Sequence, residues 1–512
     1  MGSRSRLETR PHARHRARLG ELVASLPTWP WCRDEDTFAT LAQSWDAGIR
    51  PYRDIRAYNF PGHIYLHWLL GRTLGWGRTQ AFYALDVAAL LVLGAALWAW
   101  SRRRLQGTLS GLLAYVAFLS FYLSLSYHEV AERDWHATLA AALAIMTLES
   151  WPARWAIWTA SALEALALVI RPHAILFVPA ILSAIAERPR GVRAAIEWVT
   201  GLVLFTTLGF APLLVQGILD DLARGLGVAA YGGPYSHASL ALAIEIITHE
   251  LSHRVLIVVL ASLLLLWRFD TELRPLARTW FLALVAGIVY RTVHPVQHAY
   301  LANPLALVSA IALAVPTARL VSISRLAPPV RVLVLLLVVH EVMPHVPSFC
   351  EPIESIRALK WLGRGVEPPD PPPGCRRLYF RLNFCCYPWA DYRRALDYLR
   401  RTTSPDTEIA NVLKQPPFPS FNGPVGRLSP FRTESGICWM LLIDMDLDAE
   451  FARELERSTN SVVVWSPGEI GLKSPLKLKR LTSLIAELYR PEARFGRIEI
   501  WKRTSEFYPP PK

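Results

Sequence analysis

The chain has 512 residues, of which 52% are hydrophobic and 19% charged, with 19 Trp and a formal net charge of +13. This composition excludes an ordinary water-soluble globular protein and indicates a multi-pass membrane protein. The positive charge does not predict nucleic acid as a partner, because the Arg residues cluster between apolar runs and no RRM, KH or zinc-finger pattern is present.

Residues 1–30 form a basic tail that includes Arg4, Arg6 and Arg10. We expect a disordered cytoplasmic segment. A signal peptide is not expected, because the apolar stretch that follows, Leu22–Trp31, is short and broken by prolines.

The next stretch, residues 33–75, holds the densest acidic cluster before the long apolar runs. Residues 37–42 predict a helix with Asp34 or Asp36 near its N-terminus, where carboxylates are favoured. Pro61 and Gly62 then open a second helix over His63–Leu74. We therefore predict two short helices on a membrane surface, joined by a loop that presents carboxylates.

About ten apolar runs then predict membrane spans, several of them shorter than the ~20 residues that cross a bilayer core. They are Phe82–Trp100, Leu109–Leu125, Trp135–Leu148, Trp155–Ile170, Ala174–Ala186, Ile196–Val215, Val255–Trp267, Trp280–Val293, Leu301–Val315 and Val332–Val342. Every second connection is rich in Arg, which predicts that these connections face the cytoplasm. The others, including Gly217–His253 and all residues after Pro344, are expected as outer loops and an outer domain.

Residues 344–512 have a different composition and predict a soluble, extracytoplasmic α/β domain. Short strands are expected at Met440–Asp444, Ser461–Trp465 and Gly496–Lys502, and helices at Tyr392–Arg401, Phe451–Ser458 and Leu478–Tyr489. The six Cys lack zinc-finger spacing, and their pairing cannot be derived from the sequence.

The acidic stretch also carries a resemblance. Its spaced elements are Asp-Glu-x-x-Phe-Ala-x-Leu-Ala from Asp34, Pro-Tyr-x-Asp from Pro51 and Asn-x-Pro-Gly-x-x-Tyr from Asn59. This order resembles the first outer loop of GT-C glycosyltransferases, within them most closely the protein O-mannosyltransferase and lipid A aminoarabinose-transferase branch. The resemblance implies an α-helical GT-C-like membrane domain at 31–343, with the acidic outer loop at 33–75, in the plasma (inner) membrane.

The start of the chain departs from that pattern. GT-C proteins normally begin at a cytoplasmic end and cross the membrane before the acidic loop, whereas no adequate span lies between Leu19 and Cys32. Ten spans therefore put the basic N-terminus outside. We expect either that a first span is missing from this chain or that residues 19–32 lie in the membrane interface.

The expected chemistry is transfer of a sugar from a polyprenyl-phosphate donor to a lipid, protein or glycan acceptor, with inversion. A carboxylate would serve as the base for the acceptor hydroxyl, and we predict Asp34 or Glu35 in that role. Asp134 and Asp54 are expected as supporting acids, although Asp134 at a helix start could instead serve only as a cap. The resemblance also allows a divalent ion between Asp34 and Asp134, since some GT-C members use one.

Cations are expected near the departing phosphate. The predicted contacts are Arg171 and His173 in one turn, and Arg291 and His298 around a later one. For Arg171, an interfacial anchor is the plain alternative.

Two other classes of function remain open at this stage. One is a non-catalytic transporter or flippase of a lipid-linked sugar, which would need charges within the spans; Glu164 is the clearest of the few. The other is an inactive membrane scaffold. A cavity shared by Asp34 and Asp134 would favour catalysis over the scaffold.

Overall fold

The computed structural model describes residues 33–125, 130–232, 253–293, 299–322, 389–413, 421–432, 447–466 and 478–504. The basic tail, the predicted span Val332–Val342, the predicted strand Met440–Asp444, His298 and all six Cys lie outside these ranges.

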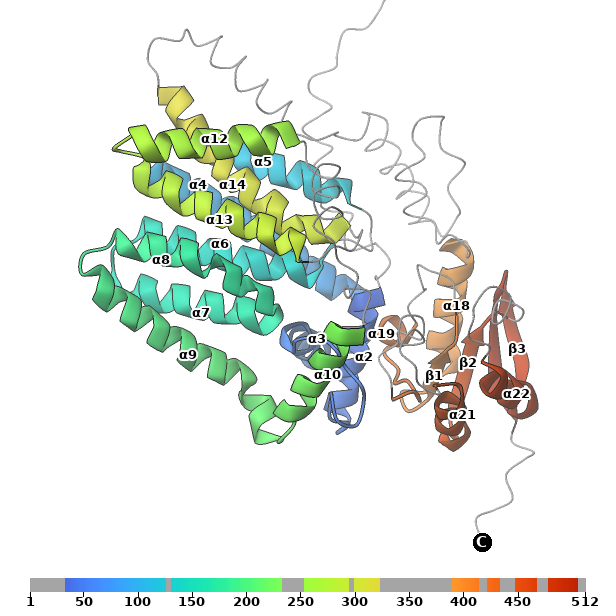
Figure 1. The fold of residues 1–512 in the computed structure, drawn as a ribbon. Coiled ribbons are helices and arrows are strands. Elements are labelled where there is room, and N and C mark those ends of the chain that lie inside the picture. Colours follow the sequence, from blue (N-terminus) through green and yellow to red (C-terminus); the bar gives the residue numbers. More distant parts are fainter. Residues whose placement is uncertain are drawn as a thin grey trace, which may run out of the picture.

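A bundle of apolar helices makes up the first part of the fold (Figure 1). It consists of α4 (Thr79–Arg104), α5 (Leu109–Ser124), α6 (Arg133–Ser150), α7 (Arg154–Ile170), η2 (Pro172–Phe177), α8 (Val178–Ala186), α9 (Gly191–Val215), α12 (His253–Phe269), α13 (Arg274–Thr292) and α14 (Asn303–Ser322). Every predicted span within the described residues is thus helical. The run Ala174–Ala186 is divided between η2 and α8, because Pro172 and Pro179 constrain the backbone there.

Three of the described helices, α4, α9 and α14, are long and apolar enough to cross a membrane, and three apolar segments are shorter. In α9 only 17% of the apolar window is buried, and Val192, Ile196 and Val215 are largely exposed. An apolar surface of this extent is unusual on a water-soluble monomer and suits a lipid environment.

Two short helices stand at one end of the bundle, as the acidic stretch predicted. They are α2 (Arg33–Asp46) and α3 (Gly62–Leu74). A third helix, α10 (Leu219–Gly232), lies beside them, where the sequence predicted only an outer loop. The apolar residues of these three helices and of the α2–α3 loop share one core with the end of α9, which includes Phe38, Ile55, Ile64, Leu213 and Leu222.

The C-terminal part forms a four-stranded sheet with helices on both faces. The strands are β1 (Glu408–Asn411), β2 (Ser461–Trp465), β3 (Tyr489–Phe495) and β4 (Ile498–Arg503), in the order β1-β2-β4-β3. Only the β1–β2 pair is parallel. One face packs with α18 (Trp389–Thr402) and α19 (Asn422–Val425), the other with α21 (Leu447–Arg457) and α22 (Lys479–Leu488). The central strand β2 is buried throughout, as its apolar sequence requires.

The C-terminal unit docks on α2 and on the α2–α3 loop (Figure 1). Asp36 accepts a hydrogen bond from the Gly423 backbone N–H at 2.5 Å, and Gln43 donates to the Gly426 carbonyl at 3.0 Å. Tyr58 packs within the core of the C-terminal unit. The acidic helix is therefore held between the membrane bundle and the sheet domain.

Arg188 closes the opposite end of the bundle, where α6 turns into α7. Its guanidinium donates to four backbone carbonyls, at 2.6 to 2.9 Å, from Leu148, Trp151, Pro152 and Ala153. The last carbonyls of a helix have no partner within it, so this side chain supplies what the helix end lacks.

Replacing Arg188 by Ala is expected to lower the free energy of unfolding by at least ~2 kcal/mol, because several buried carbonyls lose charged donors together. Arg193→Ala is the control, since its ion pair with Glu197 is exposed and is worth under ~1 kcal/mol. The measurement is the midpoint of thermal unfolding of the two variants in detergent. Equal midpoint temperatures would contradict this role of Arg188.

Two backbones cross closely where the α3–α4 loop meets α19. A Cβ added at Gly426 would lie 3.0 Å from the Gly77 nitrogen, and both glycines have positive φ, at 69° and 81°. We expect Gly426→Ala to loosen the C-terminal unit, because neither the contact nor the backbone conformation tolerates a side chain. Gly107→Ala, with nothing within 4 Å of the added atom, should have no effect. Limited proteolysis of intact protein measures this; unchanged cleavage in Gly426→Ala would count against the contact.

Candidate active site

Charged side chains gather where α2 meets the N-terminus of α6. Asp34 and Asp134 come from these two helices, and Arg133 lies between them. The Arg133 guanidinium is 3.9 Å from the Asp34 carboxylate and 3.8 Å from the Asp134 carboxylate. Asp34 has 37% of its side chain exposed, whereas Asp134 is fully buried. The sequence predicted both acids, and the structure brings them to one cation.

Asp134 has two further partners, which come from the turn after α7 and from α13. Arg171 lies 3.0 Å from its carboxylate, and the Tyr290 hydroxyl donates to the same oxygen. The His173 ring is 5.6 Å from the Tyr290 ring, and Arg291 follows Tyr290 at the end of α13, only 1% exposed. Of the predicted phosphate contacts, Arg171 thus touches Asp134 directly, and His173 packs against Tyr290, which bonds to Asp134. The Asp134 side chain is engaged in these contacts, and the N-cap residue of α6, Glu132, makes no side-chain cap hydrogen bond.

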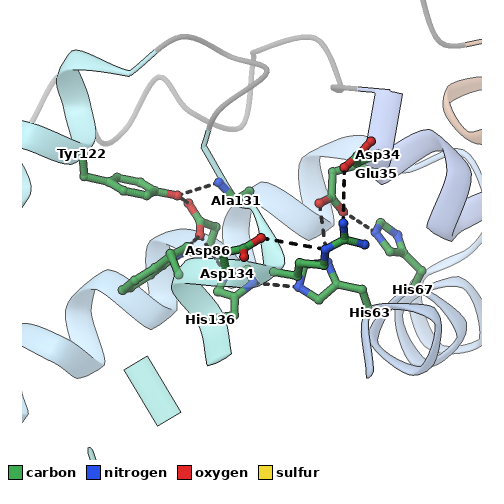
Figure 2. Close-up of polar contacts among 11 residues, drawn as sticks. Asp34, Glu35, His63, His67, Asp86, Tyr122, Ala131, Asp134 and His136 are labelled. Carbon is green, nitrogen blue, oxygen red and sulfur yellow. Dashed lines mark hydrogen bonds and ion pairs between the residues drawn. The ribbon is translucent and has the colours of Figure 1, made fainter. Parts of the chain in front are cut away.

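Glu35, the neighbour of Asp34 on α2, belongs to a separate, buried chain of polar groups (Figure 2). His67 lies 2.7 Å from one of its oxygens and His63 lies 3.5 Å from the other. His63 in turn contacts His136 at 3.0 Å, and His136 contacts Asp86 at 2.9 Å. The chain thus runs from α2 through α3 and α6 to α4.

Burial shifts the pKa values of the first members of this chain. It raises the pKa of Glu35, against the opposing hydrogen bond from His67, and it lowers the pKa of His67. Burial, with His136 next in effect, also lowers the pKa of His63 well below its usual value. Loss of hydration disfavours charge on each of these groups, so the neutral forms are favoured.

Sequence reasoning missed His63, His67, Asp86 and His136. The spacing of His63 and His67, one helical turn apart, was a usable signal, because it places both on one face of α3. Asp86 in the apolar run of α4 was a second signal, since an acid in a span needs partners.

The remaining acids of the α2–α3 stretch have local partners. Asp54 forms a bidentate pair with Arg50, at 2.8 and 3.0 Å, which lowers the pKa of Asp54 to about 2. Asp36 serves the contact with Gly423. The structure therefore gives Asp54, predicted as a supporting acid, a bond that orders its own loop.

The two acids proposed for a divalent ion do not fit one as they stand. Arg133 is within 4 Å of both Asp34 and Asp134, and Arg171 contacts the other carboxylate oxygen of Asp134. A guanidinium in those positions repels a second cation. Among the described residues, no group of three His, Cys, Asp or Glu side chains is arranged to hold a metal ion.

The fold has a known counterpart. The chain matches the crystal structure of ArnT from Cupriavidus metallidurans in the apo state, with a TM-score of 0.59 and 13% sequence identity over 97% of this chain and 98% of that one. Neither a protein-family model nor a curated protein matches the sequence. The chain therefore has an ArnT-like fold, in agreement with the resemblance carried by the acidic stretch.

Asp134→Asn tests the buried half of the cluster without an assay of activity. The amide keeps the shape but leaves Arg171 buried without its counter-charge, so we expect a loss of ~3–5 kcal/mol in the free energy of unfolding. Asp54→Asn removes an exposed pair and should lose under ~1 kcal/mol. Unfolding measured side by side in detergent checks this, and similar losses would refute the difference in role.

Proposed function

We propose that this protein is a membrane glycosyltransferase that moves a sugar from a polyprenyl-phosphate donor to an acceptor hydroxyl, with inversion. One observation carries the proposal: Arg133 lies within 4 Å of both the partly exposed Asp34 and the buried Asp134. An acid accessible to a substrate thus stands beside cations that can meet a phosphate, at one end of a bundle with the ArnT-like fold.

In the proposed step, the acceptor oxygen attacks the anomeric carbon of the donor sugar as the bond from that carbon to the phosphate oxygen breaks. Asp34 takes the proton of the acceptor hydroxyl, and the polyprenyl phosphate leaves as a monoester dianion. Attack from the face opposite the phosphate inverts the anomeric configuration. Asp34 suits the base better than Glu35, because Glu35 is fully buried and bonded to His67.

Arg171 and Arg133 are proposed to stabilise the phosphate as its charge grows. Arg171 faces Asp134 through Nε at 3.0 Å, and the five donors of a guanidinium form a fork that suits the oxygens of a phosphate. Asp134 fixes the position of Arg171 in advance of the substrate, which is how such groups lower a barrier. Arg291 and His173 are proposed as further contacts of the phosphate, as is His298, which lies outside the described residues.

For topology, we propose about ten spans in the inner membrane, with α2, α3 and the C-terminal unit on the outer face. The contacts of Asp36 with α19 and of Gln43 with Gly426 support a place for the C-terminal unit on the same face of the membrane as α2.

The scaffold alternative is disfavoured by the same geometry, since it predicted no shared site for Asp34 and Asp134. A transporter would need charged groups within the spans, and Glu164 is the clearest candidate in the sequence. Glu164 is fully buried, and neither of its oxygens accepts a hydrogen bond from the described residues. It has no ion-pair partner there with which to form a translocation path.

Transfer of label from polyprenyl-phosphate sugars in membranes tests the function. We expect Asp34→Asn to lower kcat roughly 100- to 10,000-fold, because the general base is removed while the shape is kept. Asp220→Asn, on the exposed first turn of α10, is the matched control and should transfer like the wild type. Full activity in Asp34→Asn would remove Asp34 from the mechanism, and no transfer from any donor by the wild type would refute the function.

A further inference from the structure

Asp86 is an unusual residue for an apolar helix, in which it lies about two turns from the N-terminus. It is fully buried in α4, and three donors on two other helices meet its carboxylate. These are the Tyr122 hydroxyl at 2.7 Å, the Trp135 indole N–H at 2.7 Å and His136 Nε2 at 2.9 Å. A carboxylate in such surroundings persists only where donors replace its water, and here α5 and α6 supply them.

From Asp86, one branch of contacts leads to the turn that opens α6. The Tyr122 hydroxyl accepts a hydrogen bond from the Ala131 backbone N–H at 2.6 Å. Ala131 has a φ of 61°, a conformation that costs energy for a residue with a side chain and needs support from its surroundings. Arg133 and Asp134 follow two and three residues later. The bond to Tyr122 thus helps to fix where these two charges begin α6.

The second branch leads to Glu35 through two histidines. His136 Nε2 lies 2.9 Å from Asp86, and the other ring nitrogen of His136 lies 3.0 Å from His63 Nε2. The remaining nitrogen of His63, Nδ1, lies 3.5 Å from Glu35 Oε1, and neither of these two atoms has a hydrogen-bond partner among the described residues. Because a bond between two ring nitrogens needs one donor and one acceptor, the tautomer of each histidine is tied to that of the other and to the contact with Asp86.

We propose that Asp86 is a positioning residue of the transferase site. Through His136 and His63 it places Glu35 and the first turn of α2, and through Tyr122 and Ala131 it places Arg133 and Asp134. The spacing of Asp34 from Arg133 depends on both branches. The inference rests on the proposed function and adds a residue that touches no substrate in that mechanism.

A second buried acid provides a matched control. Glu149, in the last turn of α6, also accepts from indole N–H groups, those of Trp100 at 2.7 Å and Trp280 at 3.2 Å. Its described bonds do not connect it to α2 or to the start of α6. Asp86→Asn and Glu149→Gln each replace a carboxylate that joins helices by an amide. If Asp86 served only stability, the two variants would change activity alike.

The experiment uses the purified full-length protein and a polyprenyl-phosphate sugar donor, with kcat, KM and the unfolding temperature measured for each variant. We expect Asp86→Asn to lower kcat about 100-fold at nearly unchanged KM, because an amide cannot satisfy all three donors and the reacting groups shift. Glu149→Gln should keep the wild-type kcat. His136→Gln, which retains a donor and an acceptor, should keep at least about ten times the kcat of His136→Leu.

Wild-type kcat in a folded Asp86→Asn would overturn the proposal, as would equal losses in Asp86→Asn and Glu149→Gln. Should Asp86→Asn fail to fold, the two His136 variants decide, and equal kcat values in both would overturn it. If the wild type transfers no sugar from any donor, the proposed function itself fails, which is a different outcome from an active wild type with unaffected variants.

Discussion

The structure depends on one constraint: charges buried at the edge of an apolar bundle must meet opposite charges or donors. Arg133 lies within 4 Å of two carboxylates, those of Asp34 and Asp134, and Asp134 also engages Arg171 and Tyr290. These contacts join α2, α6, α13 and the turn after α7, so the electrostatic requirement also fixes the packing of the helix ends. A group held this firmly changes little when a substrate binds, which is the condition for electrostatic preorganisation.

The position of α2 follows from contacts on both of its sides. Toward the bundle, Glu35 contacts His63 and His67, and α2 and α3 share a core with α9 and α10. Toward the C-terminal unit, Asp36 and Gln43 bond to the backbone of α19 and the residue after it. A helix of 14 residues would be marginal alone in water, so its order comes from these neighbours. The described part of the sheet domain therefore contributes to the site by positioning α2, without supplying a charged group of its own.

Much of the bundle could be predicted from the sequence, because apolar runs bounded by Arg and Pro are a local signal. The acid-rich start of α2 and Pro61 before α3 are local signals as well. The chain of Asp86, His136 and His63 could not be predicted, since each comes from a different helix and only packing brings them together. The helix α10 was missed because its acids and glycines are typical of a loop. The strand β3 was missed because it is a largely exposed edge with a proline and charged residues.

The Asp34-Glu35 pair illustrates why sequence left the choice of base open. Both are acids in the first turn of one helix, and nothing local distinguishes them. Successive residues of an α-helix point about 100° apart, so two neighbours cannot face the same surroundings. Here the Glu35 side chain faces His63 and His67, where burial favours its neutral form. Asp34 stays partly exposed beside Arg133. The difference between the two acids is thus a property of the helix orientation, which the surrounding helices and the C-terminal unit impose.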